Sequence, residues 1–157
     1  MRPATARDLA LLVGHRRRMW EEIGGFTVAE LDRADGAYRR WVERERRARR
    51  FRAYVVEEPL GRPVASGALW RSPAQPRPGA LARESMPYLL SMYTDPTARG
   101  RGIASDLVGA MVDWARSHGY RRVYLHASPL GRGVYARLGF TDGNEMRLDL
   151  PPLARTR

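Results

Sequence analysis

The stretch Tyr93-Thr94-Asp95-Pro96-Thr97-Ala98-Arg99-Gly100-Arg101-Gly102-Ile103-Ala104 is the most informative segment of this sequence. Its pattern predicts a strand, a glycine-rich turn and the first turn of an amphipathic helix. The two glycines allow backbone conformations that other residues avoid, and the helix begins directly after them. Because the first N–H groups of a helix are unpaired and its dipole attracts anions, the turn is suited to hold a phosphorylated cofactor.

Other phosphate-binding loops do not fit this segment. A Walker loop ends in Gly-Lys-Ser/Thr, and the chain contains no lysine. The dinucleotide fingerprint needs a third glycine at the position of Ser105. An RNA-binding Arg-Gly segment would be longer and repeated. The pattern that fits is Arg/Gln-x-x-Gly-x-Gly/Ala, which Arg99, Gly102 and Ala104 provide.

A second segment downstream supports this interpretation. A predicted helix and strand follow the turn, and then a short helix ends in Tyr135-Ala136-Arg137-Leu138-Gly139-Phe140. In this order of motifs the chain resembles the GCN5-related N-acetyltransferase (GNAT) family. In that family the first signature cradles the pyrophosphate of acetyl-coenzyme A, and a tyrosine stands four residues before a Gly-Phe pair. The resemblance is firm from about Met86 to Leu150, and Met1 to Leu9 also resembles the family's first strand and first helix.

The resemblance implies a cofactor site. Backbone groups of Met92, Tyr93 and Thr94 would hold the pantetheine arm and the acetyl oxygen, as an oxyanion hole does. The pyrophosphate would be held by amides of the turn, namely those of Arg99, Gly100, Arg101, Gly102, Ile103 and Ala104. Ser128 stands where many relatives of the family have an asparagine that contacts the cofactor. The serine side chain is shorter than that of asparagine, and its single hydroxyl is less suited to donate and accept hydrogen bonds at the same time. The family's fourth and fifth strands splay apart around the pantetheine arm.

The same resemblance makes Tyr135 the candidate general acid. A phenol with a pKa near 10 stays protonated at neutral pH and can protonate the departing thiolate. For the general base Glu84 is the first choice, followed by Glu57 and Glu22, with a water chain as the alternative. Since the chain has no cysteine and no Gly-x-Ser-x-Gly elbow, we expect direct attack in a ternary complex rather than an acyl-enzyme.

Composition narrows the class of protein. The chain has 157 residues, 43% of them hydrophobic, which predicts one globular domain over residues 1–150 and a disordered tail over 151–157. No apolar run approaches the roughly 20 residues that span a bilayer, and no signal peptide is apparent. The absence of cysteine excludes disulfides, and the three scattered histidines lack ligand spacing, so no metal site is expected. These features predict a cytoplasmic protein.

The chain has 28 arginines and 17 acidic residues, which give it a net charge of +11. One interpretation is nucleic-acid binding through residues 39–52. The interpretation that we favour is a compositional bias toward arginine, with residues 43–50 as the solvated face and tail of a helix. In either case the positive field favours a cofactor that carries several phosphate charges.

The elements expected along the chain follow the order β-α-α-β-β-β-α-β-α-β. Thr5-x-x-Asp8 and Thr27-x-x-Glu30 predict helix starts, Gly24-Gly25 a helix end, and Ser128-Pro129 the start of the last helix. This order predicts an α/β (α+β) GNAT fold, with a central mixed twisted sheet of about six strands and helices on both faces. The expected strands are 2–5, 52–57, 64–70, 86–94, 122–127 and 140–150, with a loop over 71–83.

The leading hypothesis is an acetyl-coenzyme A-dependent N-acetyltransferase that acts on an amine of a small molecule or peptide. The alternatives are a catalytically silent module that binds an acyl-coenzyme A and a basic nucleic-acid-binding protein. The final strand segment is shorter than the family usually has, so a partner subunit, as in a homodimer, could supply part of the acceptor wall. Four aromatic residues could line an acceptor pocket, namely Trp20, Tyr38, Trp41 and Trp70, but the helical spacing of Tyr38 and Trp41 favours the core for most of them.

Overall fold

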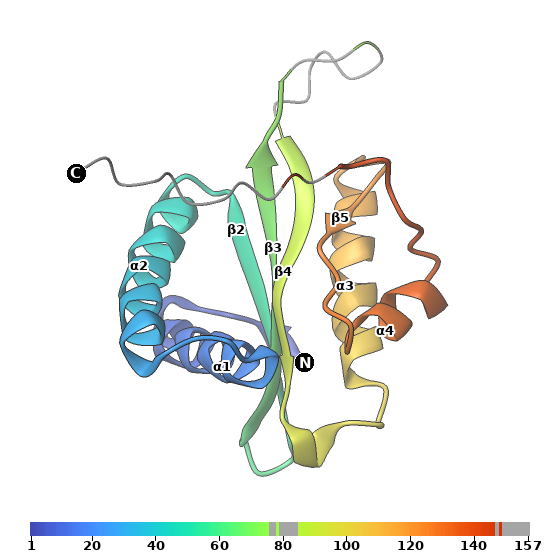
Figure 1. Cartoon of the computed structure of the whole chain (residues 1–157). Coiled ribbons are helices and arrows are strands. Elements are labelled where there is room, and N and C mark those ends of the chain that lie inside the picture. Colours follow the sequence, from blue (N-terminus) through green and yellow to red (C-terminus); the bar gives the residue numbers. More distant parts are fainter. Residues whose placement is uncertain (76–77, 79–84, 147, 149–157) are drawn as a thin grey trace, which may run out of the picture.

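The computed structural model describes residues 1–75, 78, 85–146 and 148 (Figure 1). The predicted tail over 151–157 and the candidate base Glu84 lie outside the described residues. In chain order the elements are β1 (Arg2–Pro3), η1 (Ala6–Asp8), α1 (Leu9–Ile23), α2 (Val28–Arg47), β2 (Phe51–Glu57), β3 (Pro63–Pro73), β4 (Ser85–Thr94), η2 (Pro96–Ala98), α3 (Ile103–Ser117), β5 (Tyr124–Leu125) and α4 (Arg132–Arg137), where η marks a 3-10 helix.

The sheet has five strands in the order β1-β2-β3-β4-β5. The first three pairings are antiparallel, and β5 is parallel to β4, as the predicted β4-α3-β5 crossover requires. The sixth strand, expected over residues 140–150, is not formed over 140–146, and most of the remainder lies outside the described residues. The mixed sheet of the expected fold is therefore confirmed, with five described strands.

Helices cover both faces of the sheet, with α1 and α2 on one side and α3 and α4 on the other (Figure 1). The period-2 alternation of β2 explains the two layers, because Ala53 and Val55 pack with α1 whereas Tyr54 packs with α3. On the α3 side, Leu107, Val108 and Met111 complete the core. The hydrophobic spacing of α3 thus buries one face of that helix against the sheet.

Both predicted capping boxes are present at the helix starts. Thr5 and Asp8 exchange hydrogen bonds at the start of η1, which leads into α1, and Thr27 and Glu30 do the same at the start of α2. The predicted start of the last helix was wrong: residues 128–131 form a turn, in which the Gly131 N–H donates to the Ser128 carbonyl at 3.0 Å, and α4 begins only at Arg132. The β5 strand is also shorter than predicted, and β3 extends three residues into the segment expected to be a loop.

A β-bulge interrupts β4 near its end. Opposite Gly67 of β3, two residues of β4 stand instead of one, Ser91 and Met92, and Ser91 has a positive φ of 52°. A Cβ at position 67 would clash with the Met92 side chain, so glycine leaves room for Met92 beside the bulge. The bulge changes the direction in which the last residues of β4 present their backbone groups.

Candidate active site

The glycine-rich turn leads from β4 into α3 through η2. Asp95 accepts hydrogen bonds from the Thr97 backbone N–H at 3.0 Å and from its hydroxyl at 2.7 Å, which secures the start of η2. Gly100 and Gly102 have φ values of 75° and 80°, in the left-handed region that favours glycine. Gly102 is the N-cap of α3 and has no side chain to cap it, so the helix begins with first-turn amides that a ligand can reach.

The two arginine side chains of this turn fold back onto the protein. Arg99 donates from Nε to the Thr94 carbonyl at 3.0 Å and forms an ion pair with Glu22 at 2.6 Å. Arg101 donates to the Thr97 carbonyl at 2.9 Å and lies 3.5 Å from a Glu58 carboxylate oxygen. These contacts stabilise the shape of the turn.

Strand β5 pairs with only the first half of β4. The paired residues are Tyr88 with Tyr124 and Leu89 with Leu125, and no further pairing of β4 with β5 exists among the described residues. The β4 backbone from the bulge to Thr94, which includes the predicted Met92, Tyr93 and Thr94, is therefore not covered by a parallel neighbour. This is the arrangement expected where two strands splay apart around a cofactor arm.

Tyr135 on α4 packs against the same hydrophobic cluster as Met92 and Ile103. Its ring meets that of Phe140 edge to face, with 5.9 Å between the centroids. Burial raises the pKa of the Tyr135 phenol above its ordinary value of 10. The structure thus brings the candidate acid, the end of β4 and the start of α3 together around one cluster, and the phenol is protonated at neutral pH.

Ser128 is engaged locally. Its Oγ accepts a hydrogen bond from the Gly131 N–H at 3.2 Å, within the turn that precedes α4. The side chain therefore stabilises this turn, which leads directly into α4 and its residue Tyr135.

Two of the three candidate bases hold ion pairs. Glu57 accepts hydrogen bonds from Arg2, the shorter at 2.7 Å, and this arginine lowers the pKa of the Glu57 carboxyl. Glu22 is paired with Arg99, as described above. The lowered pKa makes Glu57 a weak proton acceptor, and the carboxylate of Glu22 is occupied by Arg99.

A cavity of about 490 Å³ lies between α1, α2 and β4, in the size range of small-molecule sites. It is lined by Arg16, Met19, Trp20, Ala34, Ala37, Tyr38, Trp41, Leu90 and Ser91. Three of the four aromatic residues considered for an acceptor pocket, Trp20, Tyr38 and Trp41, thus line a cavity that reaches Ser91 in the β4 bulge. Trp70 is not among them, since it packs on Trp41 and donates its indole N–H to Glu45.

Arg16 is the cavity residue that sequence reasoning missed. Its guanidinium carbon lies 4.4 Å from the centroid of the Tyr38 ring and 5.4 Å from that of Trp20. The one available signal is that Arg16 and Trp20 stand four residues apart on a predicted helix and so share a face. In a chain with 28 arginines, that signal does not distinguish Arg16 from its neighbours.

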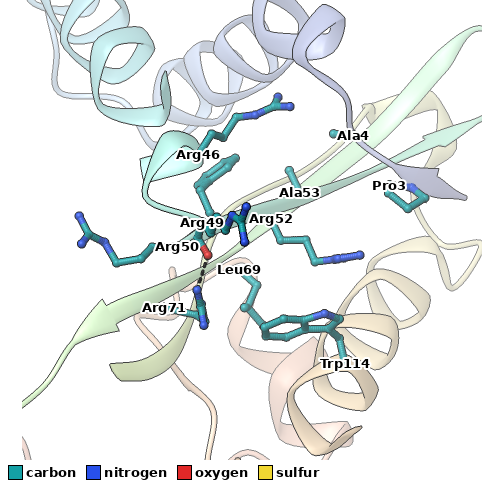
Figure 2. A pocket seen from close by; sticks show the side chains of 11 residues that line it. Pro3, Ala4, Arg46, Arg49, Arg50, Arg52, Ala53, Leu69, Arg71 and Trp114 are labelled. Carbon is teal, nitrogen blue, oxygen red and sulfur yellow. Dashed lines mark hydrogen bonds between the residues drawn. The ribbon is translucent and has the colours of Figure 1, made fainter. Parts of the chain in front are cut away.

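A second cavity, of about 350 Å³, lies around the start of β2 (Figure 2). Five arginines line it, together with Trp114 near the end of α3; they are Arg46, Arg49, Arg50, Arg52 and Arg71. Trp114 stands eleven residues after the α3 start at Ile103, which corresponds to about 16 Å along the helix. The arginine-lined cavity is therefore separate from the glycine-rich turn.

Glu45 corrects one interpretation of the arginine-rich segment. The sequence predicted a solvated helix face over residues 43–50, but Glu45 is only 2% exposed. It accepts hydrogen bonds from Arg50 at 2.7 Å, from Arg44 and from the Trp70 indole. The hydrogen bond from Arg50, above all, lowers the pKa of this carboxyl to about 2. Part of the basic segment thus anchors α2 to the sheet.

Two kinds of feature are absent from the residues that the structure describes. No group of three His, Asp or Glu side chains there could hold a metal ion. Within the same residues, no helix combines the length and the apolar composition needed to cross a membrane.

Comparisons with known proteins identify the family of this chain. The family model described as "Acetyltransferase (GNAT) family" matches residues 16–140. The chain is 30% identical over 110 residues to a glucosamine 6-phosphate N-acetyltransferase from Trypanosoma brucei brucei, covering 69% of this chain and 72% of that protein. Among solved structures, a GCN5-related N-acetyltransferase from Ralstonia eutropha superposes with a TM-score of 0.85 at 29% identity, covering 95% and 96% of the two chains.

A predicted acetyltransferase from Clostridium acetobutylicum, solved with acetyl-CoA, superposes with a TM-score of 0.83 at 29% identity and covers 96% and 94% of the two chains. The family match extends over most of this chain and includes both the glycine-rich turn and Tyr135. The protein therefore belongs to the GNAT family and is an acyltransferase of that family.

Proposed function

We propose that this enzyme transfers an acetyl group from acetyl-coenzyme A to an amine of a small molecule or peptide, by direct attack in a ternary complex. The observation that carries the proposal is the uncapped start of α3, with Gly100 and Gly102 at positive φ, beside the end of β4, which pairs with β3 but with no described part of β5. The amides of residues 99–104 hold the pyrophosphate, and Met92 to Thr94 hold the pantetheine arm and the acetyl oxygen. A solved relative that contains acetyl-CoA supports this choice of donor.

In the proposed reaction the amine nitrogen attacks the thioester carbonyl, and the C–N bond forms as the C–S bond breaks. The negative charge on the carbonyl oxygen is stabilised by backbone N–H groups at the end of β4. Tyr135 donates its phenolic proton to the departing thiolate, and burial keeps this phenol protonated. The amine loses a proton to a base, for which Glu84 or a water chain remains our proposal, since Glu22 and Glu57 are ion-paired.

The acceptor occupies the cavity between α1, α2 and β4, whose wall includes Leu90 and Ser91 directly before Met92. The name of the trypanosomal relative makes glucosamine 6-phosphate the first acceptor to test. A homodimer, a cytoplasmic location and the absence of a nucleic-acid partner stay predictions.

Two measurements on the purified protein test the proposal. Calorimetry should show that acetyl-coenzyme A binds, and a thiol-release assay over a panel of amines should show turnover with at least one amine. Binding without thiol release from any amine would favour the silent acyl-coenzyme A-binding module. If acetyl-coenzyme A does not bind, the proposed function is wrong.

A further inference from the structure

Among the described residues, Arg16 forms no ion pair. Its Nη1 atom is buried and has no hydrogen-bond partner among the described residues. The guanidinium lies over the rings of Tyr38 and Trp20, which contact its faces but accept no hydrogen bond from its edge. An arginine remains charged in such a setting, so its N–H groups need an acceptor from elsewhere.

The nearby carboxylates are already used by another arginine. Arg17 forms ion pairs with Glu21 at 3.0 Å, Asp32 at 2.6 Å and Asp35 at 2.8 Å. No aspartate or glutamate is among the described residues that line the cavity containing Arg16. The guanidinium therefore has no carboxylate beside it in the described lining, although Asp35, which is paired with Arg17, attracts it from a greater distance. An anionic ligand in the cavity would supply the direct partner.

The position of this charge relates it to the reaction. Arg16 and Trp20 supply the α1 wall of the cavity, whereas Leu90 and Ser91 supply the β4 wall. Ser91 belongs to the bulge that precedes the backbone groups proposed to hold the acetyl oxygen. A molecule that spans the cavity can thus have one end at Arg16 and the other at the point of acetyl transfer.

We propose that Arg16 binds an anionic group, a phosphate or a carboxylate, of the acceptor, so that the substrates of this enzyme are amines that carry a negative charge. The inference rests on the proposed function and names its substrate class. The planar N–H donors of arginine suit both groups, since each offers two oxygens to a pair of N–H donors. Trp20, Tyr38 and Trp41 then pack against the neutral part of the acceptor.

Binding is tested first, without turnover. Trp20 and Trp41 line the cavity, so tryptophan fluorescence can report its occupation. Each amine that carries an anionic group is titrated beside a counterpart that lacks this group: glucosamine 6-phosphate with glucosamine, and 5-aminopentanoate with pentylamine. We expect one anionic member to bind at least tenfold more tightly than its counterpart, a factor typical of a charged hydrogen-bond pair, and the successful pair distinguishes phosphate from carboxylate.

Two variants and one control assign the effect to Arg16. Arg16→Met should remove at least tenfold of the affinity for the anionic member and bring the two members close to equal. Arg16→Lys should keep part of the preference, because it keeps the charge but loses the planar donors. Arg39→Met removes the same charge from an exposed position on α2 and should keep the full preference. Thermal melting should show that Arg16→Met is folded, with at most a small loss of stability from the contacts of the guanidinium with the Trp20 and Tyr38 rings.

Equal binding of both members of each pair to the wild-type protein would overturn the inference. An undiminished preference in Arg16→Met would overturn it too. These outcomes are separate from failure of the proposed function, which is judged by calorimetry with acetyl-coenzyme A and by thiol release. If an acceptor turns over, the ratio of kcat/KM values for the amine with the anionic group and its counterpart without it should fall in Arg16→Met and persist in Arg39→Met.

Discussion

Tyr135 and Arg16 differ in how their surroundings prepare them for chemistry. Tyr135 is held by packing against Phe140 and the α3-side core, and burial raises its pKa, which keeps the phenol protonated at neutral pH as a donor for the departing sulfur. Burial lowers the pKa of the Arg16 guanidinium, and its Nη1 has no hydrogen-bond partner among the described residues. The first residue is held as a protonated donor, and the second is suited to hold a ligand.

Tyr135→Phe should lower turnover by roughly 10²–10⁴-fold, the range for a lost general acid. The affinity for acetyl-coenzyme A should barely change, because phenylalanine keeps the ring contact with Phe140. Since the pKa of the phenol lies above 10, the wild-type rate should fall on the alkaline side only above that pH, and the variant should lack this limb. Steady-state kinetics across pH, beside calorimetry, check these outcomes.

Tyr54→Phe is the matched control for this substitution. It also removes one phenolic oxygen, but Tyr54 lies in β2 and its hydroxyl accepts a hydrogen bond from Arg52 at 3.2 Å. The control should keep wild-type turnover even where it costs some stability. Wild-type turnover in Tyr135→Phe would remove Tyr135 from the mechanism.

At the scale of elements, the start of α3 decides how the donor is bound. The side chains of Arg99 and Arg101 are occupied within the turn, so the direction of the backbone N–H groups depends on Gly100 and Gly102. Two positive-φ residues within three positions produce this direction, which other residue types adopt only at a cost.

Gly102→Ala should weaken acetyl-coenzyme A binding by at least about tenfold, as measured by calorimetry, because relief of the backbone strain turns the first amides of α3 away from the pyrophosphate. The new Cβ meets nothing within 4 Å, so the effect is not a steric clash within the protein. The strain itself should cost roughly 1–2 kcal/mol of folding stability.

Gly61→Ala provides the comparison for this effect. Gly61 has a φ of 79°, beside 80° for Gly102, and its added Cβ also meets nothing within 4 Å, but it lies in the turn between β2 and β3. It should lose similar stability and bind acetyl-coenzyme A as the wild type does. Equal affinities in the two variants would mean that the turn before α3 is only structural.

For the whole molecule, His15 connects α1 to the sheet. It is 1% exposed, its Nδ1 lies 2.9 Å from the Ser66 hydroxyl on β3, and its ring lies 4.8 Å from that of Tyr93 on β4. Burial, aided by the positive charge of Arg18, lowers the pKa of His15 from 6.5 to about 4. The folded protein therefore keeps this imidazole neutral at a pH where the unfolded chain takes up a proton.

The free energy of unfolding should accordingly fall as the pH is lowered from 7 to 4.5. Between pH 6.5 and 4 the unfolded state binds one proton more than the folded state, so stability is full above pH 6.5 and is lost toward pH 4. The loss down to pH 4.5 should be roughly 2.5 kcal/mol, measured by urea unfolding at a series of pH values.

His15→Gln should remove most of this pH dependence, because an amide does not titrate. The lowered pKa values of Asp8 and Glu45 act in a different window, since their stabilisation is lost only as the pH falls below about 4.5. An unchanged slope in His15→Gln above pH 4.5 would assign the effect to other groups.

The sequence alone determined the order of the elements, both capping boxes and the glycine-rich turn, and through these the family. These features could be predicted because each depends on residues within a few positions of one another: Thr5 with Asp8, Thr27 with Glu30, and Gly100 with Gly102. Tyr135 was located in the same way, by its distance from Gly139 and Phe140. Its role and that of the turn stay proposals.

The tertiary structure alone decided which charges are paired and which are not. Glu45 was predicted to be solvated but is buried beneath Arg50 and Trp70. The sequence did not distinguish Arg16 from the other arginines, yet it lines a cavity, and its Nη1 has no hydrogen-bond partner among the described residues. The physical reason is that the pairing of a charge depends on groups from other elements, here α1, α2, β3 and β4, which only folding brings within a few ångströms. Residues that are neighbours in the sequence do not determine those distances.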